Sequence, residues 1–202
     1  MPDLYKSGHG PDCPVACMDE KSKQSIGGTR GPIPMKAGRA AKFDCEYKRN
    51  GTKNLFVAVG PKGGRHMVEV TGTRAKKDFA HFTKRLADGF CPGAKKVRAV
   101  PDNLNTHFEK SIVGTFPGKE AERIPEKVEF FHTPVHASWL DMAEMEIGIL
   151  EKECLNRRMA GKKEMIHETK AWMEGKNREE MKINWSFAKR DAYKKPSHGY
   201  VS

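Results

Sequence analysis

The chain has 202 residues, enough for one substantial hydrophobic core. Its 37 Lys and Arg outnumber its 26 Asp and Glu, and the formal net charge of +11 favours a polyanionic partner, of which nucleic acid is the usual one. The longest apolar stretch, "LFVAV", is far too short to cross a membrane, and the amino terminus has no apolar signal region. Five scattered cysteines indicate free thiols of a reducing cytosol.

The first half of the chain predicts a loose start followed by strands. In chain order we expect a loose segment over 1–14, a short buried strand over 15–20, a long loop or irregular hairpin over 21–41, a short strand at 42–48, and strands at 54–60 and 65–72. The last two are joined by "PKGG", which is typical of a hairpin turn.

The second half alternates helices and strands. In chain order we expect a helix over 73–90 with Gly89 at its C-cap, a strand over 95–100, helical residues 104–124 interrupted at Gly114 and Pro117, a strand over 127–133, a helix from 138 with Ser138 and Asp141 as capping box, and a basic helical segment from 162. A hairpin followed by helix-linked strands that return parallel is an α/β layout.

Two of the apolar runs end on an acid. "VACMD" ends on Asp19, and "VRAVPD" ends on Asp102. If these strands are parallel neighbours, both carboxylates emerge at the same edge of the sheet, where α/β proteins place their ligands. The helix after the last strand offers a third acid from Asp141, Glu144 or Glu146. Converging carboxylates need a cation, and such oxygen ligands suit Mg²⁺ or Mn²⁺. Each acid is also an ordinary turn or cap residue, so the pattern alone does not decide.

A zinc site is the main alternative metal centre. Cys13, Cys17, His132 and His136 have permissible spacings, but Cys17 falls inside the first strand and the pairs are unlike common zinc modules.

Candidate contacts to nucleic acid lie in the basic loop and after the second acid. Arg30, Lys36 and Arg39 are expected to bind DNA phosphates, although a solvated loop explains the same residues. His107 could touch a phosphate or the outer shell of a metal, although a helix-start histidine facing solvent is the simpler reading.

Five stretches in this order carry a resemblance to a known family. They are "CMDEK", "KRNGTKNLFVAVGPKGGRHMVEV", "TRAKKDFAHF", "DNLNTH" and "FHTPVHASWLDMAEMEIGIL". Together they resemble the catalytic domain of insertion-sequence transposases of the mariner superfamily (insertion sequence 630 family), DDE superfamily endonucleases. The resemblance runs from about Val15 to about Lys189.

The resemblance implies a ribonuclease-H-like fold: a mixed five-stranded sheet, with an antiparallel hairpin plus parallel strands, flanked by helices and followed by a C-terminal helical extension. It implies a Mg²⁺ or Mn²⁺ triad of Asp19, Asp102 and Glu144 that cleaves and transfers DNA strands, with insertion at TA steps. Helical geometry leaves Glu144 and Glu146 equivalent, and the family pattern selects Glu144. Asp141 occupies a position that is usually Asn in relatives.

The resemblance also sets expectations for organisation and partners. Residues 1–14 form a loose segment, 15–158 the catalytic domain and 159–202 a basic helical extension and tail. Relatives have an amino-terminal helix-turn-helix region, so we expect a truncated chain that binds transposon ends and target DNA, as a homodimer or paired with full-length transposase. We expect it in the cytoplasm, associated with the nucleoid of a bacterial-type cell and not with a membrane. A catalytically silent, DNA-binding remnant or regulator is the alternative.

Pro101 departs from the family pattern, because relatives usually have an apolar residue there that donates a backbone hydrogen bond. Proline cannot donate, and it is disfavoured in central strands. We therefore expect it to weaken the edge of the sheet that carries Asp102.

Overall fold

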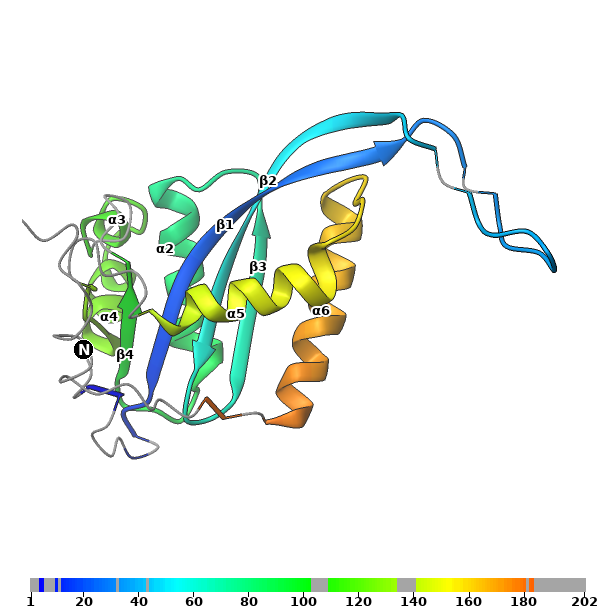
Figure 1. The fold of residues 1–202 in the computed structure, drawn as a ribbon. Helices are drawn as coiled ribbons and strands as arrows, with labels where there is room; N and C mark the ends of the chain where they lie inside the picture. The colour runs from blue at the N-terminus through cyan, green and yellow to red at the C-terminus, as the bar shows by residue number, and fades with distance from the viewer. Residues whose placement is uncertain are drawn as a thin grey trace, which may run out of the picture.

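A mixed five-stranded sheet forms the centre of the molecule (Figure 1). The structure is a computed structural model that describes residues 4–5, 10, 12–31, 33–42, 44–102, 109–133, 141–180 and 182–183. Its strands are β1 (Val15–Gly28), β2 (Tyr47–Gly60), β3 (Arg65–Thr71), β4 (Val97–Pro101) and β5 (Val128–Phe130), in the spatial order β3-β2-β1-β4-β5. β1, β2 and β3 pair antiparallel, whereas β4 pairs parallel with β1 and with β5. The predicted mixed α/β fold is confirmed.

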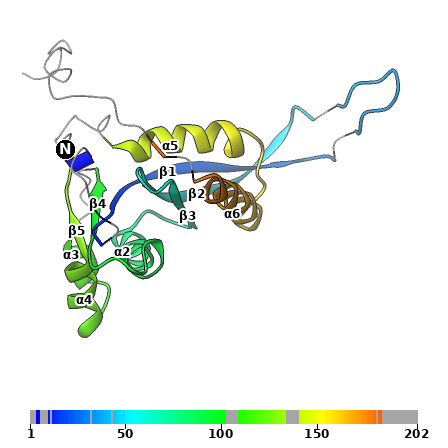
Figure 2. The ribbon, with the colours of Figure 1, turned by 90° about the horizontal axis from the view of Figure 1, so that it is seen from below.

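Helices cover both faces of this sheet. They are α2 (Lys76–Arg85) with the π-helical turn η1 (Leu86–Phe90), α3 (Glu109–Val113), α4 (Lys119–Lys127), α5 (Met142–Leu150) with the π-helical turn η3 (Glu151–Leu155), and α6 (Lys162–Glu179). Figures 1 and 2 show α5 across one face and α2, α3 and α4 on the other, while α6 runs along β3. Within the described part of the chain, no helix has both the length and the apolar character needed to cross a bilayer.

Strand alternation divides the core between the two faces. Ala16 and Met18 of β1 pack in the cluster that contains Phe79 and Phe82 of α2. Val15 and Cys17 pack instead with Met142 and Ala143 of α5, so the two sets alternate along the strand. By the same alternation, Asp19 continues the α5 face and Glu20 continues the α2 face.

β1 and β2 extend past the other strands, and their distal part, residues 26–49, forms an arm that projects from the body (Figure 1). Their pairing reaches Gly28 opposite Tyr47, and the register shifts between Gln24 and Ile26. The base of the arm is fixed, because the Ile26 N–H donates to the Met159 carbonyl at 2.7 Å. Where we expect a long loop or an irregular hairpin over 21–41, β1 continues as a strand to Gly28, past its expected end at residue 20, and pairs with β2 as a hairpin.

The distal end of the arm is a narrow two-chain turn. Isolated bridges join Ile33 to Lys42 and Lys36 to Arg39, and Gly38 lies between the second pair with a φ of 75°. A φ in this range is easy for glycine and strained for other residues. The short strand expected at 42–48 was wrong, because β2 begins only at Tyr47.

Several predicted element boundaries need correction. The helix over 73–90 is α2 followed by η1, and Gly89 lies inside that π-helical turn instead of at a C-cap. The strand expected over 127–133 is ordered as a strand only over β5. Asp141 is the N-cap of α5, which begins at Met142, while Ser138 lies outside the described residues. The predicted interruption near Gly114 and Pro117 is confirmed by the break between α3 and α4.

Pro101 lies inside β4, as predicted. The Phe131 and Thr133 N–H groups donate to the carbonyls of Ala99 and Pro101, at 2.8 and 3.2 Å. Ala99 and Pro101 therefore direct their backbone polar groups toward the β5 side. The Arg98 N–H, one position earlier, donates to the other side, at Pro14. The donor lost to proline therefore belongs to the β5 side, and the expected weakening does not fall on the β1–β4 pairing.

Candidate metal centre

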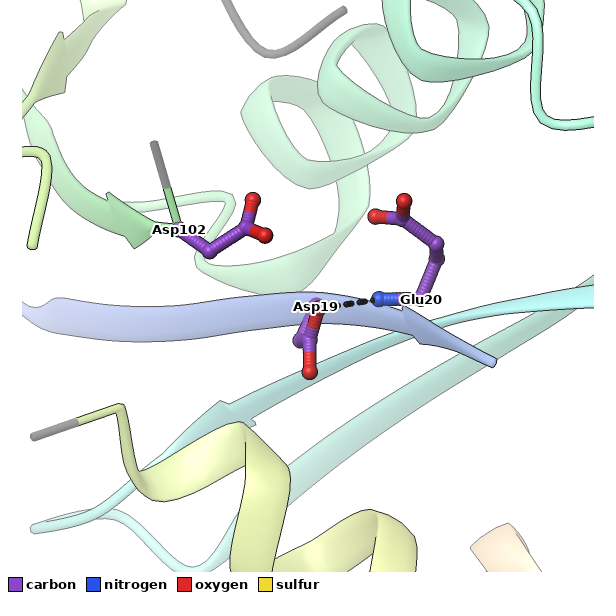
Figure 3. A group of neighbouring side chains, drawn as sticks. All are labelled: Asp19, Glu20 and Asp102. Atoms are coloured by element: carbon purple, nitrogen blue, oxygen red, sulfur yellow. Dashed lines mark hydrogen bonds between the residues drawn. The ribbon is translucent and has the colours of Figure 1, made fainter. Parts of the chain in front are cut away.

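Two acids meet where β4 ends beside β1. The parallel register pairs Met18 with Pro101, so Asp19 and Asp102 follow at the same level of the sheet. One carboxylate oxygen each from Asp19, Glu20 and Asp102 lie within 4.8 Å of one another. Figure 3 shows the Asp102 and Glu20 carboxylates on one side of β1 and the Asp19 carboxylate extending to the other side, where α5 lies. The predicted meeting of Asp19 and Asp102 is thus present in the structure.

Glu20 is a member of this cluster that sequence reasoning did not single out. Its backbone N–H donates to Asp19 Oδ1 at 2.7 Å, which holds the neighbouring carboxylate in place. Its Oε1 lies 3.8 Å from the Arg74 guanidinium, whose side chain is 61 % exposed. Arg74 therefore places a cation beside the acids and open to solvent. The sequence gives no sign of this, because alternation assigns Asp19 and Glu20 to opposite faces.

Asp141 begins α5 beneath the acids. Its Oδ1 accepts from the Ala143 N–H at 2.9 Å, as an N-cap does. The residue is only 1 % exposed, and its Oδ2 has no hydrogen-bond partner among the described residues. Burial raises the pKa of the Asp141 carboxyl well above its usual range, and the charges of Asp19, Asp102 and Glu144 raise it further, against the hydrogen bond from Ala143. All three predicted triad acids therefore act on this one buried group.

The structure separates the two glutamates of α5. Glu144, in the first turn, is exposed, and its charge reaches Asp141 at the start of the helix. Glu146 is 8 % exposed and turned toward β3, where its Oε2 lies 2.9 Å from His66 Nε2. Glu146 is therefore engaged elsewhere. Glu144 is not within the 4.8 Å cluster of Asp19, Glu20 and Asp102.

The zinc alternative has no support in the described residues. Cys17 is fully buried in β1, where its thiol donates to the Tyr5 hydroxyl at 3.5 Å, and burial raises its pKa. Among the described residues the acid cluster is the one group of three or more His, Cys, Asp or Glu close enough to share an ion. His136, like His107, lies outside those residues.

The predicted phosphate contacts lie far from the acids in the fold. Arg30, Lys36 and Arg39 belong to the distal arm, and all three are exposed. The Arg30 guanidinium is 4.0 Å from the Asp44 carboxylate, which partly neutralises it. Lys36 and Arg39 face each other across the turn at the tip.

The chemistry of the cluster fits a hard divalent cation. Carboxylate oxygens are the donors that Mg²⁺ and Mn²⁺ prefer, and three to four of them at a sheet edge repel one another unless a cation is bound. The partly exposed position of Asp19 and Asp102 leaves room for a water or a substrate oxygen as a further ligand. The residues present therefore fit such an ion.

Comparison with known proteins agrees with this fold. A family model described as DDE superfamily endonuclease matches residues 14–166, more than half of the chain. The crystal structure of the Mos1 strand transfer complex is similar at a TM-score of 0.51 and 16 % identity, covering 88 % of this chain and 52 % of that one. The mariner Mos1 paired-end complex with Mg has a TM-score of 0.47 at 16 % identity, with the same coverage of 88 % and 52 %. The chain thus spans about half the length of these structures. No curated protein sequence matches it.

Proposed function

Because the chain belongs to the DDE superfamily of endonucleases, we propose that it is the catalytic domain of a transposase that cleaves and transfers DNA strands. The observation that carries the proposal is the meeting of Asp19 and Asp102 where the parallel pairing of β1 with β4 ends. Glu144 lies on α5, the helix that crosses the sheet face to which Asp19 points. Asp19 and Asp102 are more than eighty positions apart in the chain, so local structure alone does not bring them together.

We assign the metal to Asp19, Asp102 and Glu144. When bound, Mg²⁺ or Mn²⁺ supplies activation of a water and stabilisation of the leaving oxygen in phosphodiester chemistry. The protein contributes the geometry: β1 and β4 hold two carboxylates at a fixed separation, and α5 brings the third from the sheet face. The Glu20 N–H orients Asp19, since it donates to one of its oxygens.

Cationic side chains near the acids support DNA as the substrate, because they can bind its phosphates. Arg74 lies beside Glu20 and is mostly exposed, so its guanidinium is available to a phosphate next to the cluster. Further out, the arm presents Lys36 and Arg39 at its tip, in a chain with a net charge of +11. A duplex held at the acids and at the arm would be bound through its phosphates without base readout.

Metal-dependent nicking tests the proposal directly. The full chain, incubated with supercoiled plasmid, should produce nicked circles with Mn²⁺ or Mg²⁺ and none with EDTA or with Ca²⁺, whose larger radius does not support the same geometry. Gel analysis of the plasmid and filter binding of the same DNA are measured in parallel. Binding without nicking under all metals would contradict catalysis and favour the silent DNA-binding alternative.

The arm makes a separate prediction about DNA affinity. Lys36→Gln with Arg39→Gln should lower the slope of log K against log salt by about 2, since each phosphate contact contributes roughly 0.9 to that slope. Nonspecific duplex DNA titrated at several salt concentrations gives the slope. The matched control is Lys119→Gln with Lys152→Gln, which removes the same charge from exposed positions on the body. Equal slopes for the two double variants would show that the arm does not contact DNA.

A further inference from the structure

A buried pair links the helix of the third acid to the sheet. Glu146 lies two residues after Glu144 on α5 and is 8 % exposed, and His66 on β3 is 3 % exposed. Glu146 Oε2 and His66 Nε2 are 2.9 Å apart. The two residues are 80 positions apart in the sequence, so the contact is purely tertiary.

Both ring nitrogens of His66 face acceptors. Nδ1 lies 3.1 Å from the Gly64 carbonyl oxygen, which accepts hydrogen bonds and cannot donate them. Nε2 faces the Glu146 carboxylate. Both ring nitrogens therefore lie within hydrogen-bonding distance of an oxygen, and together the two contacts define the orientation of the imidazole.

His66 is itself fixed by α6. The Asn177 side chain accepts from the His66 N–H at 2.6 Å and donates to the His66 carbonyl at 3.0 Å. The Trp172 ring meets the imidazole edge-on, with centroids 5.5 Å apart. The imidazole that receives Glu146 is therefore held from β3 and from α6 together.

Along α5 itself the other contacts with the sheet are mainly apolar, and a second polar contact lies at its C-cap, where Glu151 Oε1 accepts from Lys23 Nζ of β1 at 2.7 Å. Ala143, Ile147 and Leu150 are buried against strands β1 and β2. Apolar packing gives attraction with little direction, whereas a hydrogen bond specifies an orientation. Two residues along an α-helix turn by about 200°, so anchoring Glu146 on β3 sends Glu144 to the opposite flank.

We propose that the Glu146–His66 pair is a positioning device that fixes the rotation of α5 and so directs the Glu144 carboxylate toward Asp19 and Asp102. This inference rests on the proposed function, because it gives Glu144 the role of third acid. Glu146 and His66 are positioning residues: neither touches the cluster formed by Asp19, Glu20 and Asp102. The pair also makes α6 part of the device, through Asn177 and Trp172.

The proposal is tested by the affinity of the full chain for Mn²⁺ in the absence of DNA. This affinity is measured from the electron paramagnetic resonance signal of free Mn²⁺. Glu146→Leu should raise the Kd for Mn²⁺ by roughly 10- to 100-fold, the loss typical when a partner that orients a metal ligand is removed. Glu146→Gln keeps an acceptor for His66 and should fall between Glu146→Leu and the wild type. All titrations are made well below the melting temperature of each variant.

A double variant separates positioning from stability. His66→Leu with Glu146→Leu leaves neither buried partner without the other, so its melting temperature should recover toward that of the wild type. The directional contact is still absent, so its Kd for Mn²⁺ should stay high. Recovery of both quantities together would mean that the pair only stabilises the fold, and would overturn the proposal.

Two further variants distinguish the proposal from its premise. Ile124→Val, fully buried on the opposite face of the sheet, should lower the melting temperature with no change in the Kd for Mn²⁺. Glu144→Gln should weaken Mn²⁺ binding more than any variant of Glu146. If Glu144→Gln leaves the Kd unchanged, the assignment of the third acid fails. If Glu144→Gln weakens binding and Glu146→Leu does not, only the positioning role fails.

Discussion

Replacing Asp19 or Asp102 with Asn should lower Mn²⁺-dependent plasmid nicking by more than about 100-fold, because removal of an outer partner of a metal site alone costs 10- to 100-fold. Asn preserves the size of the side chain and removes one negative charge from the cluster. Since the carboxylates repel one another without a cation, neither change should lower the melting temperature of the metal-free chain. Nicked product is quantified by gel, and the melting temperature by circular dichroism.

An exposed acid outside the cluster provides the control for these variants. Asp12→Asn removes the same charge from a side chain that pairs with Lys95 at 3.1 Å, near the amino end of the sheet. Its nicking rate should equal that of the wild type. Full activity in both Asp19→Asn and Asp102→Asn would rule out the assignment of these acids to the metal.

Asp141→Asn should stabilise the metal-free chain at neutral pH by on the order of 1 kcal/mol or more, because burial disfavours the ionised carboxyl and each unit of pKa shift corresponds to about 1.4 kcal/mol. Asn caps α5 equally well, because its side-chain oxygen can still accept from the Ala143 N–H. It removes a buried charge that faces Asp19, Asp102 and Glu144. In a chain of this length the change corresponds to a rise in melting temperature of a few degrees per kcal/mol.

The direction of the pKa shift of Asp141 determines how the stability gained by Asp141→Asn changes with pH. The folded-state pKa of Asp141 is raised, so the folded chain binds a proton that the unfolded chain releases. The contribution of Asp141 to stability is therefore fully present below its unfolded pKa and is lost as pH rises toward the folded pKa. The advantage of Asp141→Asn should accordingly be small in acid and grow toward neutral pH, as measured by thermal unfolding across that range.

A second carboxylate supplies a control with the opposite sign. The Arg123 hydrogen bond lowers the pKa of Asp88, so any contribution of Asp88 is present above its unfolded pKa and is lost as pH falls. Asp88→Asn should thus lose stability relative to the wild type toward neutral pH.

With Mn²⁺ present, Asp141→Asn should lose its advantage in stability, because the charge at Asp141 then faces a cation. A lower melting temperature for metal-free Asp141→Asn at neutral pH would contradict this account.

The sequence carried enough information for the sheet and for the position of Asp19 and Asp102 at one edge of it. Two apolar runs end on Asp19 and Asp102, and their acids share one edge if the two strands are parallel neighbours; the register of Met18 opposite Pro101 shows that arrangement. The reason is local: a buried strand is visible as a run of apolar residues, and the residue that ends it is visible too.

The proposed third acid, Glu144, could not be selected from the residue pattern alone. Glu144 and Glu146 flank the apolar stripe of α5 symmetrically, and only the partner of one of them distinguishes the two. That partner is His66, on a strand 80 residues earlier in the chain, with no local signal that it binds a carboxylate. The resemblance to a family selected Glu144, and the burial of Glu146 is consistent with that choice.

The length of β1 was missed for a related reason. Beyond Glu20 the strand carries mainly Lys, Ser, Gln and Gly, so no alternation of apolar and polar residues marks it. Residues 21–28 therefore read as a basic, glycine-containing loop. The π-helical turn that contains Gly89 is equally hidden, since glycine near the end of a helical pattern usually indicates a C-cap.

The continuity of β1 has a mechanical consequence. Asp19 and one side of the arm belong to the same strand, β1, so the arm is connected directly to the residue at the acid cluster. The register shift between Gln24 and Ile26 lies roughly 20 Å from Asp19 at the usual rise of a strand, and a bulge is where a ribbon bends most readily. The Ile26–Met159 hydrogen bond acts at the same level as a fulcrum. A force applied at the tip is therefore expected to reach Asp19 through β1.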